Sequence, residues 1–237
     1  MKYPTTVEIT LKKFSLIIGG GKFGTKAAEY LLRNSKPFIV LDKDEKCLVT
    51  KTLDLAKLNP DEIDHIDSSK NYFAKGNMVD ALTLIEKIKP EYVFPTAPIH
   101  IAAMLVKEKY GLKVWDEGIN HFLAGIPLKI IISVGKGTVV VSYNRDKPCK
   151  QNCNAPPICP VTKLKKPCPM YDLLQFAAPE AIILRSYQLE PGLGALKGNE
   201  IIKVLEKCKG KSSVIIGTAC KCHGVITALR AQKDKSH

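Results

Sequence analysis

The fold of this chain is decided near its start, by the stretch FSLIIGGGKFG at residues 14–24. The run 14–18 is apolar and leads directly into glycines, which is typical of a buried parallel strand. Apolar side chains then recur at helical spacing over residues 22–34, and residues 37–42 form a second apolar run. The stretch therefore predicts a strand, a glycine turn, a helix and a second strand parallel to the first.

The same alternation of strands and helices continues toward the middle of the chain. Residues 79–88 and 99–110 have helical patterns, and residues 92–95 and 113–115 have strand patterns. An alternating order of this kind favours the α/β class, with a doubly wound parallel, Rossmann-like sheet. We expect this dinucleotide-binding domain to span residues 1–125.

The second part of the chain, residues 126–237, has a different texture. Two β-rich runs, 128–134 and 138–143, flank the turn 135–137 and predict an antiparallel hairpin. A segment rich in proline and cysteine follows at residues 144–170. Taken together, these features predict a smaller, cysteine-rich, metal-binding α+β domain. Its last elements are expected to be a strand, a helix, a strand and a helix, over residues 181–184, 199–207 and 213–216 and from about Cys220 onward.

Composition limits the classes of protein and partner. The 237 residues are 45% hydrophobic and 25% charged, which is ordinary for a soluble globular chain. No run approaches the roughly 20 apolar residues that span a bilayer. Residues 1–8 lack the apolar core of a signal peptide, so we expect a cytoplasmic protein. The net charge of +13 indicates either a solvated lysine-rich surface or an anionic partner, although no nucleic-acid motif is present.

The glycine turn has the features of a dinucleotide site. Gly19 permits a tight turn, Gly21 lets the backbone approach a pyrophosphate, and Gly24 lets the helix pack closely on the strand. The helix that begins with Lys22 and Phe23 presents free N–H groups and the positive end of its dipole to phosphate. These residues predict a bound dinucleotide; the alternative is a glycine-rich turn without a ligand.

An acidic residue closes the second strand. Asp42 follows Gly24 by 18 positions, where it can hydrogen-bond both ribose hydroxyls, which favours NAD(H) over NADP. The adjacent Lys43 leaves the choice between the two cofactors open. His100 lies at the carboxyl end of a later strand, where it is either a contact for nicotinamide or substrate or a surface histidine at a helix start.

The glycine turn in residues 17–24 and the strand end at residues 40–42 resemble two groups of nucleotide-binding domains. One group is the TrkA-N or RCK type found in potassium-uptake regulators. The other is the dehydrogenase domain of sirohaem synthases, which has a similar triple-glycine turn but usually lacks an acid where this chain has Asp42. The resemblance covers residues 14–115 and implies the fold and the dinucleotide, but no reaction.

Eight cysteines are present, and seven of them follow residue 148. Clustered cysteines in a cytosolic protein indicate metal binding or redox chemistry more often than disulfides. The first four of these seven are spaced C-x3-C-x5-C-x8-C. This spacing matches neither the C-x2-C pairs of zinc sites nor the C-x2-C-x2-C run of bacterial ferredoxins. Flanking prolines and lysines favour an iron–sulfur cluster, with zinc or a set of reduced or redox-active thiols as alternatives. The candidate ligands of this segment are Cys149, Cys153, Cys159 and Cys168.

A second cysteine motif, TACKCHG, lies at residues 218–224. We expect it to follow a buried strand and to open a helix, where free N–H groups lower the pKa of a thiol. Cys220 and Cys222 can complete the metal site, form a second site or act as a reactive pair, with His223 as a further ligand candidate. The alternative is a core-lining cysteine with a helix-capping histidine.

The second half of the chain is similar to uncharacterised cysteine-rich proteins of anaerobic bacteria and archaea. Residues 142–146, 185–189 and 219–224 carry this resemblance. It implies a nucleotide domain joined to a cysteine-rich domain, but no substrate.

The motifs together predict an NAD(H)-binding redox protein with a cysteine-ligated metal centre. Its partners would be the dinucleotide and a redox partner protein, and a homo-oligomer is compatible with this hypothesis. One alternative is a non-catalytic nucleotide or redox sensor that regulates a partner. Another is an NAD-dependent oxidoreductase in which zinc only braces the cysteine segment.

Overall fold

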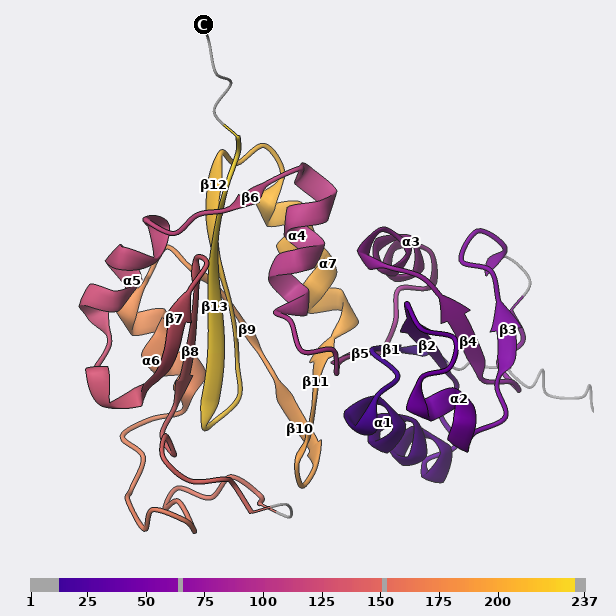
Figure 1. The fold of residues 1–237 in the computed structure, drawn as a ribbon, viewed down its shortest axis with the longest axis horizontal. Helices are drawn as coiled ribbons and strands as arrows, with labels where there is room; N and C mark the ends of the chain where they lie inside the picture. The colour runs from indigo at the N-terminus through magenta and orange to yellow at the C-terminus, as the bar shows by residue number, and fades with distance from the viewer. Residues whose placement is uncertain (1–12, 64–65, 151–152, 233–237) are drawn as a thin grey trace, which may run out of the picture.

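The computed structural model of the protein describes residues 13–63, 66–150 and 153–232. Its two β-sheets have α-helices between them and against their outer faces (Figure 1). The layers are therefore helix, sheet, helix, sheet and helix. In the described part of the chain, no helix is long and apolar enough to cross a membrane.

The first sheet takes five strands from the N-terminal part of the chain and two from the C-terminal part. Its order is β10-β11-β5-β1-β2-β4-β3. The five strands from β5 to β3 are parallel, whereas β11 is antiparallel to β5 and β10 is antiparallel to β11. The strands are β1 (Ser15–Ile18), β2 (Phe38–Asp42), β3 (Ala56–Leu58), β4 (Tyr72–Lys75), β5 (Tyr92–Pro95), β10 (Tyr187–Glu190) and β11 (Leu193–Lys197).

The second sheet has the order β7-β8-β13-β12-β9, and β6 pairs with β13 beside this path. Only β9 and β12 pair in parallel; the other described pairs are antiparallel. The strands are β6 (Lys113–Val114), β7 (Ile131–Gly135), β8 (Thr138–Ser142), β9 (Ile182–Arg185), β12 (Ser213–Ala219) and β13 (His223–Arg230).

The helices form three layers around these sheets. Helices α1 and α2 contribute to the core outside the first sheet, α3, α4 and α7 to the core between the sheets, and α5 and α6 to the core outside the second. A short 3-10 turn precedes β7. The helices are α1 (Lys22–Arg33), α2 (Leu48–Thr52), α3 (Met78–Ile88), α4 (Ile101–Tyr110), α5 (Gly118–Gly125), η2 (Leu128–Ile130), α6 (Met170–Ala177) and α7 (Gly198–Cys208).

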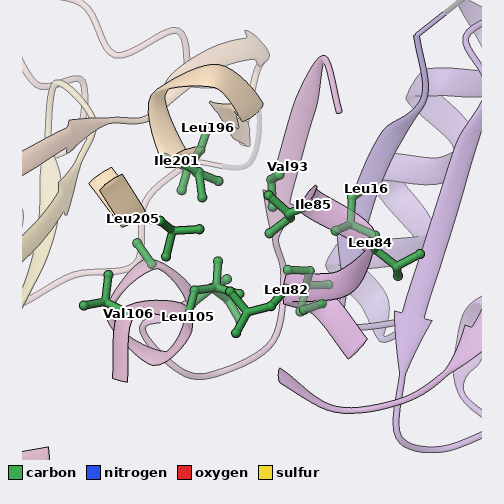
Figure 2. Packing of buried hydrophobic residues seen from close by; sticks show 14 of the residues in the cluster. Leu16, Leu82, Leu84, Ile85, Val93, Leu105, Val106, Leu196, Ile201 and Leu205 are labelled. Atoms are coloured by element: carbon green, nitrogen blue, oxygen red, sulfur yellow. The ribbon is translucent and has the colours of Figure 1, made fainter. Parts of the chain in front are cut away.

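The middle helical layer contains the largest apolar core. Figure 2 shows Ile85 of α3, Leu105 of α4 and Ile201 of α7 turned toward one another. The same cluster includes Leu16 from the first sheet and Ile216 from the second. One continuous core therefore joins the two sheets.

The prediction of a doubly wound, parallel Rossmann-like sheet followed by a smaller domain is wrong, because both sheets are mixed. The hairpin β10–β11 comes from the C-terminal half and pairs with β5 at the edge of the parallel strands. It stays there because Leu196 packs toward the middle helices while Leu193 and Ala195 pack toward α1. An edge strand that alternates its side chains in this way extends the sheet and both of its cores.

Several local predictions were confirmed and two were wrong. The strand–turn–helix–strand over residues 15–42 and the hairpin of β7 and β8 are present. The strand near residue 113 pairs with β13 of the second sheet rather than extending the first. No helix begins near Cys220, because the β-branched residues Val225, Ile226 and Thr227 follow and form a central strand.

Elements from the two halves of the sequence are interleaved in space. Strand β6 precedes residue 125 but belongs to the second sheet, and β10 and β11 follow it but belong to the first. The predicted division into residues 1–125 and 126–237 stays a prediction.

The glycine turn is held from three directions. Gly19 has a φ of +111°, a conformation that side chains rarely adopt, and the backbone of Ala97 lies against it. The hydroxyl of Thr96 donates to the carbonyl oxygen of Gly19 over 2.7 Å. At Gly24, a Cβ would overlap the carbonyl oxygen of Gly19, whereas a Cβ at Gly21 would meet nothing within 4 Å.

This contrast predicts different outcomes for two similar substitutions. Gly24→Ala should lower the free energy of unfolding by about 2 kcal/mol or more, because the helix must move away from the strand. Gly21→Ala should cost no more than about 1 kcal/mol, since its Cβ enters open space. Urea unfolding of both variants measures the difference. Equal stability of the two would contradict the close packing at Gly24.

Candidate functional site

A cavity of about 670 Å³ lies where four segments of the chain meet. The long loop between β8 and α6 supplies Cys149, Cys153 and Cys159, and the turn between β12 and β13 supplies Cys220 and Cys222. The other two segments are the hairpin β10–β11 and the start of α1. In Figure 1 the long loop lies beyond the ends of β8 and β13. Five of the six predicted ligand cysteines therefore line one cavity.

The hairpin β10–β11 joins the cysteine loop to the glycine-turn helix. The side-chain amide of Gln188 donates to the carbonyl oxygen of Cys153 over 2.7 Å. On the other side, the ammonium group of Lys26 in α1 donates to the carbonyl oxygen of Pro191, also over 2.7 Å. Phe23, the second residue of α1, is 60% exposed and lines the cavity. Both sequence motifs thus contribute to the same space.

The turn that contains Cys220 directs N–H groups at its own sulfur. The backbone N–H groups of Cys222 and His223 donate to the Sγ atom of Cys220 over 3.4 and 3.3 Å. In the loop, the backbone N–H of Ala155 donates to the Sγ atom of Cys153 over 3.4 Å. Donors of this kind favour the thiolate over the thiol.

The imidazole ring of His223 lies between two cysteines from different segments. Its Nε2 atom is 3.4 Å from the sulfur of Cys149, and its Nδ1 atom is 3.7 Å from the sulfur of Cys220. Burial raises the pKa of Cys220, but hydrogen bonds from His223 and the backbone N–H groups outweigh it, so the pKa is lowered. The hydrogen bond with Cys220 raises the pKa of His223 to about 9. The lowered pKa of Cys220 and the raised pKa of His223 together favour a thiolate–imidazolium pair.

The remaining thiols have different surroundings. The ammonium group of Lys166 donates to the sulfur of Cys222 over 3.1 Å, although burial keeps the pKa of that thiol raised. Cys168 does not line the cavity; its sulfur is 3.8 Å from the hydroxyl of Tyr143, which does. Cys47 and Cys208 are buried in apolar cores.

The thiols surround the cavity rather than meeting at one point. Across residues 13–63, 66–150 and 153–232, no three His, Cys, Asp or Glu side chains are grouped closely enough to hold a metal ion. The ligand set Cys149, Cys153, Cys159, Cys168, Cys220 and Cys222 stays a prediction.

Asp42 has a structural role that the sequence did not suggest. Its Oδ2 atom accepts a hydrogen bond from the backbone N–H of Gly20 over 2.5 Å, and its Oδ1 atom accepts one from Asp44 over 2.9 Å. The carboxylate therefore closes the glycine turn onto the end of β2. Lys22 and Lys43 are exposed beside this turn. Contacts of these residues with a dinucleotide stay predictions.

Sequence reasoning missed the wall that β9 and β10 contribute. Arg185, Tyr187 and Gln188 line the cavity, although no strand was predicted between residues 184 and 213. The turn residues Pro191 and Gly192, between two short runs with alternating apolar side chains, are the signal that could have identified the hairpin.

His100 is buried behind the site rather than exposed at a helix start. Its Nδ1 atom is 2.8 Å from the hydroxyl oxygen of Thr227, and its Nε2 atom is 3.0 Å from that of Thr218. Both partners belong to strands that flank the turn of Cys220 and Cys222. The histidine therefore links the N-terminus of α4 to the second sheet.

The chain is therefore a mixed α/β protein with a cysteine-lined cavity between its two sequence motifs. The chain belongs to the AF_1314 family: the model described as "Uncharacterized protein, N-terminal domain" matches residues 14–101, and that described as "Uncharacterized protein, C-terminal domain" matches residues 102–232. A relative from Archaeoglobus fulgidus, named "Uncharacterized protein", is 46% identical over 215 residues, which cover 91% of this chain and 98% of the relative. No solved structure matches the chain.

The resemblance to TrkA-N or RCK domains and to sirohaem synthases is corrected by these findings. The two matching families are the AF_1314 domains, and the sheet that contains the glycine turn is mixed. A strand, a triple-glycine turn and an acid at the next strand end recur in many α/β proteins, so they did not define this family.

Burial of His100 predicts a specific dependence of stability on pH. Burial lowers the pKa of His100 to about 3 from its ordinary 6.5. The unfolded chain therefore binds this proton near pH 6.5 and the folded chain does not, so stability is lost as pH falls from 6.5 toward 3. His100→Gln should be less stable at neutral pH and should lose less stability on acidification. Urea unfolding across this pH range measures both the stability at neutral pH and its loss on acidification, with the exposed residue variant His121→Gln as the control. If the stability of His100→Gln falls with pH as steeply as that of the unmodified protein, the lowered pKa of His100 is contradicted.

Proposed function

We propose that this protein is a redox protein that binds NAD(H) at the glycine turn and holds an iron–sulfur cluster in the adjoining cavity. One observation carries the proposal: Phe23 at the start of α1 lines the same cavity as five cysteines. A nucleotide with its pyrophosphate at the N-terminus of α1 can therefore extend toward the thiols. The proposal unites two motifs that are far apart in the sequence.

The donor chemistry of the cavity supports a thiolate-ligated centre. N–H groups point at the sulfur atoms of Cys153 and Cys220, as they do at thiolates that bind metals. Among the described residues, four cationic lysine and arginine side chains line the cavity and no Asp or Glu does, so the surroundings favour a centre with net negative charge. These cations are Lys150, Lys166, Arg185 and Lys221.

The arrangement of the donors supports a cluster over a single zinc ion. Zinc gathers four ligands around one atom at about 2.3 Å for sulfur. An iron–sulfur cluster is bound through several iron atoms, so its thiolates stand around a larger volume. Five thiols on the walls of a cavity of about 670 Å³ match the second requirement.

The glycine turn supports a dinucleotide in a complementary way. Gly21 is the N-cap of α1, has no side chain to occupy the first free N–H groups, and borders open space. The first turn of α1 contains no acidic residue. An anionic pyrophosphate is therefore attracted by the helix dipole and meets no carboxylate from the first turn of α1.

The roles of the two centres follow from electron counting. A hydride carries two electrons, whereas a cluster supplies one-electron transfer when bound. Exchange of electrons between them therefore requires a mediator that accepts two electrons and releases them one at a time, such as a flavin, whereas a substrate can accept the hydride directly. The cavity offers room for either beside Cys220. The imidazole ring of His223 lies next to this sulfur, and Asp42 holds the glycine turn at which the nucleotide is proposed to bind.

Anaerobic purification followed by iron and sulfide analysis tests the metal centre. The protein should be brown, with broad absorption at about 400 nm, and each of Cys149→Ser, Cys220→Ser and Cys222→Ser should lose most of this absorption. Cys168→Ser is the matched control from the same loop and should retain the absorption, because Cys168 does not line the cavity. Colourless protein with stoichiometric zinc would contradict the cluster.

Nucleotide binding can be tested without disturbing the fold. Gly21→Asp places a carboxylate where the pyrophosphate is expected, yet aspartate is a favourable N-cap, so stability should be kept. NADH should bind at least about tenfold more weakly to this variant, while the neutral N-cap of Gly21→Ser should weaken it less. Calorimetry measures both affinities. Tight NADH binding by Gly21→Asp would argue against a site at this turn.

A further inference from the structure

One guanidinium group lines the cavity without a carboxylate partner. Arg185 is the last residue of β9 and pairs in register with Ala219, which precedes Cys220. None of the ion pairs in the described ranges involves Arg185. Its guanidinium instead contacts two aromatic rings, at 4.7 Å from the centroid of Tyr171 and 5.0 Å from that of Tyr187.

The two rings hold this side chain in place. The hydroxyl of Tyr187 donates to the Oε1 atom of Glu200 over 2.7 Å, which fixes the ring. The backbone N–H of Ser186 donates to the carbonyl oxygen of Ala219 over 2.7 Å, which fixes the main chain beside the cysteine turn. Stacked arginines lose little freedom when they bind a ligand, so the guanidinium is prepared for a partner.

The rest of the cavity indicates what that partner is. In the part of the chain that the structure describes, the lining has cationic side chains and no acidic ones, so it attracts an anion. It also has apolar surface, from Phe23, Val161 and Leu193. Its volume of about 670 Å³ suits a small molecule. A planar guanidinium binds the two oxygens of a carboxylate or phosphate side by side.

We propose that Arg185 binds the carboxylate or phosphate group of a small organic substrate and holds it beside Cys220 and His223. The substrate's role as the two-electron partner of the nucleotide rests on the function proposed above. The oxyanion site itself rests on three observations among the described residues: the guanidinium has no carboxylate partner, it contacts two aromatic rings, and the cavity lining has no acidic side chain. Arg185 is thus assigned to substrate binding, separate from the thiols and from the glycine turn.

The test is calorimetric titration of the full-length protein with two probes, succinate for a carboxylate and inorganic phosphate for a phosphate. At least one should bind, and the tighter of the two identifies the chemistry that the site prefers. Arg185→Gln should weaken that binding at least about tenfold. Arg185→Lys should weaken it several-fold, because lysine keeps the charge but lacks the planar pair of donors. Arg145→Gln, which removes an arginine outside the cavity lining, should bind like the unmodified protein.

The metal and nucleotide measurements separate this inference from the proposed function. Arg185→Gln should keep the metal content and the NADH affinity of the unmodified protein, because it removes no thiol and leaves the cationic Lys150, Lys166 and Lys221 in the cavity lining. If the protein proves to lack a cluster but Arg185→Gln still loses oxyanion binding, the proposed function fails and this site stands. If neither probe binds, or if Arg185→Gln loses NADH affinity and the bound probe competes with NADH, the assignment of Arg185 to substrate is overturned.

Discussion

The helices α3, α4 and α7 bury apolar side chains against a sheet on each side, and the position of both sheets follows from this shared layer. Buried residues occur around most of α4, including Ala102, Leu105 and Val106, as expected for a helix that packs against a sheet on each side. Because protein interiors are close-packed, the sheets cannot slide independently. The ends of β9, β10 and β12 are thereby held around one cavity.

A short segment after β5 ties the two candidate centres together within this frame. Thr96 and Ala97 donate to the carbonyl oxygens of Gly19 and Ile18 at the glycine turn. His100, a few residues later, contacts Thr218 near the cysteine turn. Buried polar groups need hydrogen-bond partners. A shift of the glycine turn relative to the cysteine turn would therefore leave some of these groups unpaired. The fold thus fixes the position of the glycine turn, the candidate nucleotide site, relative to the thiols of the cavity.

Local patterns in the sequence were sufficient for elements whose partners are close in the chain. The strand, turn and helix over residues 15–33 and the hairpin at residues 131–142 follow from apolar periodicity and glycine positions. The pairing of β11 with β5 could not be predicted, because backbone hydrogen bonds between distant strands leave no periodic signal.

The turn at Cys220 was mistaken for a helix start for a related reason: only the pairing of β13 with both β8 and β12 makes it a hairpin. Clustering of cysteines was visible in the sequence, whereas the exclusion of Cys168 from the cavity depends on how the loop is folded.

The loop between β8 and α6 has little apolar packing of its own to determine its shape. Ile158 and Leu164 are exposed, and the loop is instead joined by an isolated bridge between Ile158 and Lys165 and by polar contacts with Gln188 and His223. A segment of this kind gains order from whatever binds its side chains, because ligand binding offsets the conformational entropy that packing does not. Cys149, Cys153 and Cys159 lie on the side of the loop that borders the cavity, so a ligand there would order the loop and shape the proposed oxyanion site at once. Under the proposed function, binding and folding would therefore be coupled in this part of the protein, while the five-layer frame stands on its apolar cores.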